Sequence, residues 1–194
     1  MKVCGLTGGV GMGKSTAAGF LLQNNIRVID TDDLARELTQ PGQTALAEIR
    51  QEFGPSVFLA DDNLNRAELA RIVFGNTTSR EKLQAILHPR IRERWLGQIE
   101  QWRGEKIETA CVVIPLLFET QAERYFNKII CVACSAGQQQ GRLRQRGWSL
   151  DQIKRRQSAQ LAIDKKMTQS HFVVWTEGEL ATSHEQLRRI IGRI

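Results

Sequence analysis

The sequence predicts an α/β fold built on a parallel sheet, and two observations carry that prediction. Short runs rich in Val, Ile and Cys alternate with stretches in which apolar residues recur at helical spacing. The first of these runs also leads through a glycine-rich loop directly into a helical stretch. We expect five strands, in chain order, at Lys2–Leu6, Ile26–Asp30, Ala110–Ile114, Lys128–Ala133 and Phe172–Trp175.

The glycine-rich loop matches a phosphate-binding pattern. Residues 8–15 read GGVGMGKS, which fits G-x-x-x-x-G-K-[ST]. In this pattern backbone N–H groups surround nucleotide phosphates, Lys14 reaches the β and γ phosphates, and the Ser15 hydroxyl ligates Mg²⁺. The loop also precedes a helix, whose N-terminus favours an anion. The alternative, a glycine-rich turn that binds nothing, has no need of a lysine followed by a hydroxyl. The sequence therefore predicts a three-layer fold of the P-loop NTPase type.

Composition limits the class of protein. The chain has 194 residues and a net charge of +6. We expect one domain with insertions, because ordinary fractions of apolar and charged residues accompany this length. No apolar run reaches the length of a membrane span and no signal peptide precedes the first strand, so we expect a cytoplasmic protein without a membrane partner. The positive charge suits an anionic partner, whether nucleic acid, anionic lipid or a phosphorylated small molecule.

The four cysteines, Cys4, Cys111, Cys131 and Cys134, lie in apolar, strand-like runs. The last two form a C-x-x-C, which is compatible with redox chemistry or half a zinc site. No second pair or nearby histidines complete a metal site. We therefore interpret all four as buried thiols that act as small apolar side chains.

Two long excursions interrupt the predicted strands. The first lies between the second and third strands and contains helical stretches at 45–53, 66–74 and 80–87, then another after Pro89. The second is rich in Arg and Gln, and its glycines give it the freedom of a mobile lid. We expect a nucleotide-binding core at 1–31, 104–136 and 161–194, a helical acceptor-binding subdomain at 32–103, and a lid at 137–160.

Charged side chains near the carboxyl ends of the strands are the catalytic candidates. Asp32 follows the second strand, at the edge where ligands bind in open parallel sheets. A kinase needs a carboxylate there to orient and deprotonate the attacking hydroxyl, or to hold Mg²⁺. Arg36 comes one helical turn later and would share a face with Asp32. The alternative is an acidic first turn that the helix dipole favours.

Further candidates lie in the excursions and after the third strand. Arg142 and Arg146 would share a helical face and offset charge on a transferring phosphoryl group, although a solvated basic face is an equal alternative. Residues 115–119 read PLLFE and either line an acceptor pocket or begin the next helix. His88, a lone histidine in the helical excursion, is of a kind more often structural than catalytic.

With these motifs in this order, the chain resembles the dephospho-CoA kinase family over essentially its full length. The matching segments, in order, are GLTGGVGMGKST, VIDTDDLAR, LNRAELARIVF, LHPRIR, IPLLFE, RLRQRGWS and the pair Arg156 and Gln160. The resemblance implies ATP-dependent phosphorylation of the ribose 3′-hydroxyl of dephospho-CoA, which is the last step of coenzyme A biosynthesis. It also implies ATP and dephospho-CoA as small-molecule partners, Mg²⁺ as cofactor and no nucleic acid. For the oligomeric state we expect a monomer or a weak homo-oligomer.

The resemblance further implies roles for single residues. Asp32 would be the catalytic base, and Lys14, Arg142 and Arg146 would stabilise the transferred phosphoryl group. Residues that would hold the ATP phosphates are Gly11, Met12, Gly13, Lys14, Ser15 and Thr16, with Ser15 ligating Mg²⁺. Residues on the acceptor-binding side would be Asp32, Arg36, His88, Leu116, Leu117, Phe118 and Glu119.

One departure from the family's sequence pattern and two rival functions stay open from the sequence alone. The family usually has Asn, near the adenine, where this chain has Thr176, which leaves the base preference undecided. Another small-molecule kinase would share the loop, base and lid and differ only in the acceptor pocket. A nucleic-acid-binding module would use the basic lid, but Trp148 is the only aromatic residue among its charges. A GTPase is excluded because the chain has neither D-x-x-G nor N-K-x-D.

Overall fold

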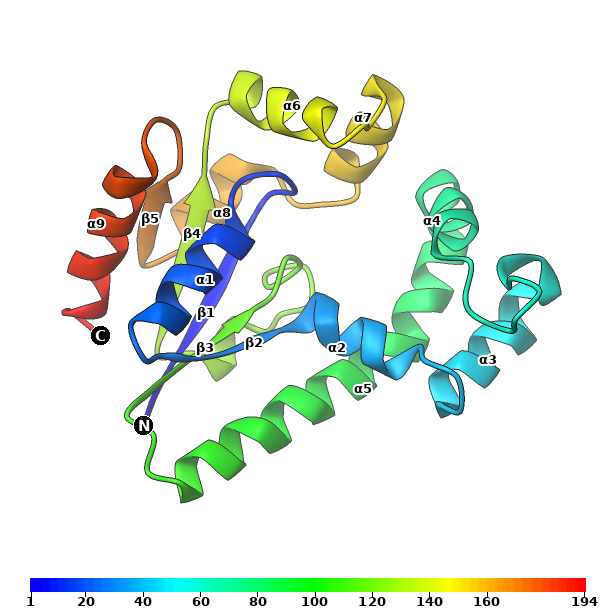
Figure 1. Ribbon diagram of the computed structural model, residues 1–194, viewed down its shortest axis with the longest axis horizontal. Helices are drawn as coiled ribbons and strands as arrows, with labels where there is room; N and C mark the ends of the chain where they lie inside the picture. The colour runs from blue at the N-terminus through cyan, green and yellow to red at the C-terminus, as the bar shows by residue number, and fades with distance from the viewer. The chain divides into compact units, whose positions relative to one another are not determined.

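A computed structural model describes all residues, 1–194 (Figure 1). The chain divides into two compact units, which are residues Met1–Asp30 with Trp102–Ile194, and residues Thr31–Gln101. None of the helices is both long enough and apolar enough to span a membrane. The finer division into core, acceptor-binding subdomain and lid stays a prediction.

The first unit contains a five-stranded parallel sheet in the order β2-β3-β1-β4-β5. This confirms the predicted fold class and all five strands, with bounds shifted by two residues at most. The strands are β1 (Lys2–Gly8), β2 (Arg27–Asp30), β3 (Thr109–Val113), β4 (Lys128–Ala133) and β5 (Phe172–Trp175). Because parallel strands have their carboxyl ends at one edge, the loops after β1, β3 and β4 meet there.

Helices cover both faces of this sheet and make the three layers. Figure 1 shows α1 (Lys14–Gln23) in front of the sheet and α8 (Ile163–Gln169) behind it. Helix α9 (Leu180–Ile191) packs beside α1 and β5. The apolar core between α1, α9 and the sheet includes Leu6, Leu21, Val113, Ile130 and Leu187. Burial of this apolar surface is the main stabilising term of the unit.

On the opposite face, β1 has a glycine where the segment after β3 approaches closely. A Cβ at Gly5 would lie 2.6 Å from Leu117 Cδ1 and 2.9 Å from the Phe126 ring. Only glycine leaves room for both side chains. Phe126 follows the short 3₁₀ turn η2 (Glu123–Tyr125), which leads into β4.

Beyond the carboxyl end of β4, the chain forms α6 (Ala136–Gln145) and α7 (Leu150–Ser158) (Figure 1). Ser149 and Gln152 make the reciprocal capping box that their spacing predicts, because each side chain bonds the backbone N–H of the other. Gly147 has φ of 82° in the turn between the two helices, a conformation that favours glycine.

The second unit is helical, as predicted for the first excursion. Its elements are α2 (Thr31–Leu38), α3 (Thr44–Phe53), η1 (Pro55–Val57), α4 (Arg66–Gly75) and α5 (Thr77–Gly104), the last of these up to Gln101. Its own core is formed by Leu46, Ile49, Val57, Leu64, Leu69 and Val73.

One boundary prediction in this unit is wrong. The sequence suggests a break at Pro89, but α5 continues through it as one helix. Proline cannot donate to the carbonyl four residues earlier and crowds that turn. Here the neighbouring Arg90 guanidinium donates to the Ile86 carbonyl at 2.6 Å and also bonds Glu48 at 2.5 Å. The Ile86 carbonyl is one residue beyond that of Ala85, which Pro89 leaves without its helical donor, so these contacts hold the adjoining turn of the helix.

Candidate active site

The loop between β1 and α1 is a tight turn that depends on glycine. Gly8, Gly11 and Gly13 have φ of 145°, 75° and 98°, which side-chain-bearing residues rarely adopt. A Cβ at Gly8 would also lie 2.7 Å from Val132 Cγ2. Gly13 is the N-cap of α1, so the loop ends at the positive end of a helix dipole.

The Lys14 side chain lies against its own loop. Its Nζ donates to the carbonyl oxygens of Gly8 at 2.9 Å and of Gly9 at 3.0 Å. These bonds hold an ammonium group beside the amides that precede α1. Ser15 and Thr16 are exposed in the first turn of α1. The structure thus brings together a cation, a helix N-terminus and two hydroxyls, which is an arrangement suited to anionic phosphate and a hard metal ion.

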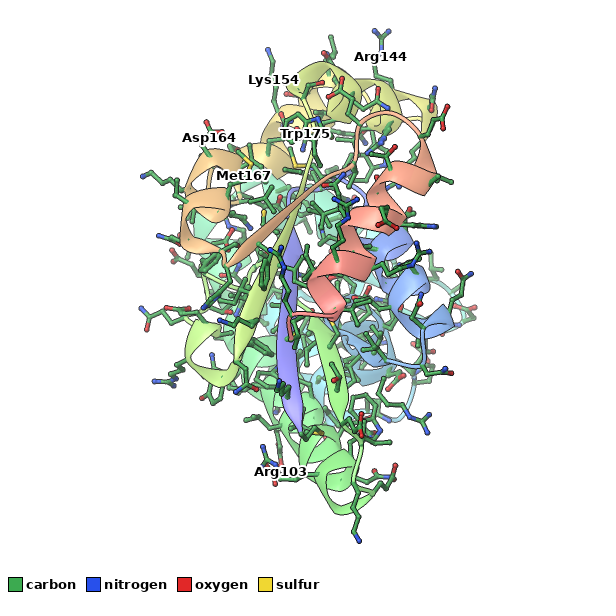
Figure 2. All side chains as sticks on the ribbon, turned by 90° about the vertical axis from the view of Figure 1, so that its left-hand side faces the viewer. Arg103, Arg144, Lys154, Asp164, Met167 and Trp175 are labelled. Carbon is green, nitrogen blue, oxygen red and sulfur yellow. The ribbon has the colours of Figure 1, made fainter.

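Met12 belongs to this loop but points into the protein. Its side chain is buried among Ala133, Cys134, Ile163 and Met167. Figure 2 labels Met167 on α8, which is the helix that Figure 1 shows behind the sheet. Only the Met12 backbone is therefore open to a role in ligand binding.

Thr176 joins the loop to helix α6. Its hydroxyl donates to the Met12 carbonyl at 2.9 Å and accepts from Arg142 Nη1 at 3.0 Å. Arg142 Nη2 also donates to the Thr176 carbonyl. The sequence identified Arg142 as a phosphate candidate and Thr176 only as a departure from a pattern. The structure places the two in direct contact.

Arg146 is placed differently from Arg142. Helix α6 ends at Gln145, and Arg146 is its exposed C-cap. That Arg142 and Arg146 share a helical face stays a prediction. Figure 2 shows Arg144 of α6 and Lys154 of α7 extending outward from this end of the unit.

Side chains of α6, and Gln160 just after α7, also contact the loop at Val10 and Gly11. Gln139 Nε2 donates to the Val10 carbonyl at 2.7 Å, and Gln160 Oε1 accepts from the Val10 N–H at 3.0 Å. Leu143 packs over Gly11, where a Cβ would lie 2.8 Å from Leu143 Cγ.

The segment after β3 makes an unexpected ion pair. Glu119 Oε1 lies 2.8 Å from Lys166 Nζ and accepts the Leu161 N–H at 2.7 Å. Lys166 is fully buried and donates to the Pro115 carbonyl at 2.6 Å. Sequence reasoning missed Lys166, because lysine is rarely buried and nothing in the local sequence marks this one. Leu117 is also fully buried, so its side chain is part of the core.

Next to this ion pair is a surface cavity of about 620 Å³ in the first unit. Two of the predicted acceptor-side residues, Phe118 and Glu119, line it. The other lining residues are Glu123, Arg124, Ile129, Leu161, Gln169 and His171. Both apolar and charged groups therefore border this cavity.

In the second unit, Asp32 lies in the first turn of α2. Arg36 Nη1 pairs with Asp33 Oδ1 at 2.7 Å. Arg66 Nη2 donates to the Arg36 carbonyl at 3.2 Å and to Thr39 Oγ1 at 2.8 Å. Burial, and next the charge of Arg36, lower the pKa of Arg66. The guanidinium groups of Arg36 on α2 and Arg66 on α4 therefore lie near each other. Arg66 is a candidate site residue that sequence reasoning did not single out.

His88 lies on α5 and is half-buried. Burial lowers its pKa, and the nearby charge of Arg92 lowers it further. Its imidazole is therefore neutral at pH 7 and is able both to donate and to accept a hydrogen bond.

A parallel sheet of this order, with a glycine-rich phosphate loop between its first strand and a helix, defines a nucleotide-binding protein of the P-loop kinase class. A family model described as dephospho-CoA kinase matches residues 2–182. The dephospho-CoA kinase of Bdellovibrio bacteriovorus is 42% identical over 174 residues, covering 90% of this chain and 87% of that protein. The chain belongs to the dephospho-CoA kinase family, a family of enzymes of coenzyme A biosynthesis that use ATP as phosphoryl donor.

Two solved structures are similar to the chain over its whole length. A Thermus thermophilus crystal structure matches with a TM-score of 0.81 and 26% identity, covering 100% of this chain and 97% of that one. The dephospho-CoA kinase from Campylobacter jejuni matches with a TM-score of 0.71 and 25% identity over the same shares. The likeness to both extends over the whole chain rather than over the phosphate loop alone.

Proposed function

We propose that this chain transfers the γ-phosphoryl group of ATP to the ribose 3′-hydroxyl of dephospho-CoA, giving coenzyme A and ADP. The observation that supports this most directly is the Lys14 ammonium, which the Gly8 and Gly9 carbonyls hold at the N-terminus of α1. A fixed cation there neutralises charge on the transferred group without reorganising during the reaction.

On the donor side, the loop and the first turn of α1 hold the phosphates. The residues in this role are Gly11, Met12, Gly13, Lys14, Ser15 and Thr16. The exposed hydroxyl of Ser15 suits Mg²⁺, which prefers a few oxygen ligands together with water and phosphate oxygens. When bound, Mg²⁺ would neutralise part of the negative charge on the nucleotide phosphates.

On the acceptor side, Asp32 is the proposed base. It takes the proton of the 3′-hydroxyl as the oxygen attacks the γ-phosphorus, and the bond from that phosphorus to the bridging oxygen of ADP breaks. Its place just after β2 supports this role, because carboxylates after parallel strands lie where ligands bind. Arg36, His88, Leu116, Phe118 and Glu119 are the proposed acceptor-binding residues, with Leu117 anchoring their segment in the core.

Residues 137–160 are the proposed lid, with Arg142 and Arg146 as its cationic residues. The Arg146 side chain is exposed, and the bonds that cap the end of α6 are made by backbone groups. We assign it to the transferring phosphoryl group. Arg142, which bonds Thr176, would reach the nucleotide from the end of β5.

An ADP-release assay with dephospho-CoA, adenosine and pantothenate as alternative acceptors tests the proposal. We expect turnover with dephospho-CoA to exceed the others, and Lys14→Ala to abolish it. Asp32→Asn should collapse kcat and leave ATP affinity intact. Preference for another acceptor would overturn the substrate assignment. A larger loss in Asp30→Asn than in Asp32→Asn would identify the other carboxylate as the base.

A further inference from the structure

Three glutamines are linked by hydrogen bonds to one residue of the phosphate loop, two of them directly and the third through its neighbour. Gln157 Nε2 donates to Gln139 Oε1 at 2.7 Å, and Gln139 Nε2 donates to the Val10 carbonyl at 2.7 Å. Gln160 Oε1 accepts the Val10 N–H at 3.0 Å. Both backbone polar groups of Val10 are therefore bonded by side chains from a distant part of the sequence. We call these three glutamines the glutamine clamp.

Gln139 is the central residue of the clamp, and its amide uses both of its functions. It donates to Val10 and accepts from Gln157 at the same time, which neither a carboxylate nor an ammonium group can do. Its side chain is 5% exposed, so water cannot easily replace a lost partner. The two bonds also fix which end of the amide faces the loop.

The loop that receives these bonds needs external support. It contains three glycines with positive φ, and glycine loses more conformational freedom on ordering than any other residue. Leu143, fully buried, packs over Gly11 immediately after the clamped Val10. The loop is thus held from α6 at two successive residues, upstream of Lys14.

We propose that Gln139 is a positioning residue for ATP binding, acting through Val10 to hold the phosphate loop in its phosphate-binding shape. A loop already ordered before ATP arrives loses less conformational entropy on binding, and this raises affinity. Gln157 and Gln160 extend the same support from α7 and the residues after it. The inference rests on the proposed function, since it assigns the loop to ATP.

The test compares Gln139→Leu with Gln140→Leu, its exposed neighbour on the same helix. Leucine keeps the volume of Gln139 and removes both hydrogen bonds. We expect KM for ATP to rise about tenfold in Gln139→Leu, the size of effect that one or two lost hydrogen bonds produce. KM for dephospho-CoA should not change, and Gln140→Leu should match the wild type in both. A merely structural defect would lower the active fraction and leave both KM values alone.

Gln139→Glu supplies a rescue that depends on pH. Its carboxylate still accepts from Gln157 but repels the Val10 carbonyl, whereas the protonated carboxyl donates to that carbonyl. We therefore expect kcat/KM for ATP, relative to wild type at the same pH, to recover as the pH is lowered. Gln139→Leu should show no such recovery.

Calorimetric titration with ATP alone separates this inference from the proposed function. Weaker ATP binding by Gln139→Leu, measured at a temperature at which the variant is fully folded, supports the clamp whichever acceptor the enzyme uses. Unchanged ATP affinity, or an equal rise in both KM values, overturns it. If Gln139→Leu does not fold, Gln160→Leu, which removes the acceptor of the Val10 N–H, gives the same comparison.

Discussion

The Nζ atom of Lys166 lies 2.8 Å from Oε1 of Glu119, and the lysine side chain has no exposed surface. A buried ammonium group is tolerated only when it is paired and hydrogen-bonded. Here the Pro115 carbonyl supplies a further acceptor, and Glu119 in turn holds the Leu161 N–H. The pair therefore connects α8 with the segment after β3 and with the residues that follow α7.

Replacing Lys166 should destabilise the fold strongly. Lys166→Met keeps the length of the side chain but leaves the Pro115 carbonyl and Glu119 without their partner. We expect the free energy of unfolding to fall by about 2–4 kcal/mol, because breaking a buried pair from one side is costly. Urea unfolding measures this. Lys165→Met, at the exposed neighbouring position, should change the same quantity by less than about 0.5 kcal/mol. Equal stability of both variants would contradict the account of the ion pair.

The hydroxyl of Thr176 should be important for stability through its bonds to the phosphate loop and α6. Thr176→Val is nearly isosteric and leaves the Met12 carbonyl and one Arg142 donor without this partner. The unfolding free energy should fall by about 1–2 kcal/mol, as for other unsatisfied polar groups. Thr182→Val, at an exposed position of α9, is the matched control for the change of side chain. A similar effect of both variants in thermal or urea unfolding would show that the Thr176 bonds contribute nothing specific.

Arg146→Ala should impair catalysis without affecting folding. The side chain is exposed at the end of α6, so its loss removes little packing, and it removes the charge that we assign to the phosphoryl group in the proposed function. We expect kcat to fall about 10²-fold, a typical loss for one group that stabilises a transition state electrostatically. Steady-state kinetics against both substrates measures this, with Arg144→Ala as control. A larger rise in KM for dephospho-CoA than loss of kcat would place Arg146 in the acceptor site instead.

Stability should depend on pH through His88. Burial lowers the pKa of His88 in the folded state, so between that pKa and the ordinary value near 6.5 the unfolded chain binds more protons. The unfolding free energy should therefore rise with pH across this window. The contribution of His88 to stability is present above about pH 6.5 and is lost as the pH falls toward its folded-state pKa. Chemical unfolding at several pH values measures the slope. His88→Gln should flatten it, whereas an unchanged slope would assign the dependence to other groups.

Sequence predicts the features here that depend on short-range patterns. The five strands, the phosphate loop and the Ser149–Gln152 cap all follow from periodicity, glycine placement or fixed spacing. The continuation of α5 through Pro89 does not, because a local rule treats proline as a break and ignores contacts with other parts of the fold, such as the bond of Arg90 to Glu48 on α3.

The contacts that support the site cannot be predicted from short-range patterns either, because they join residues that are far apart in the sequence. Thr176 bonds Met12 and Gln139 bonds Val10 across most of the chain, and Lys166 is buried beside an identical, exposed residue. Nothing in the local sequence distinguishes these side chains from surface polar groups. Only the folded sheet brings them to the phosphate loop and to the segment after β3.

Identification of the phosphorylated product tests the central claim most directly. The enzyme is incubated with ATP, Mg²⁺ and dephospho-CoA, and the product is analysed by mass spectrometry and by ³¹P NMR correlated to the ribose protons. The account predicts a single added phosphate coupled to the proton on the 3′-carbon, formed together with one equivalent of ADP and absent with Lys14→Ala. A phosphate on any other oxygen, or release of ADP without a phosphorylated acceptor, would contradict it.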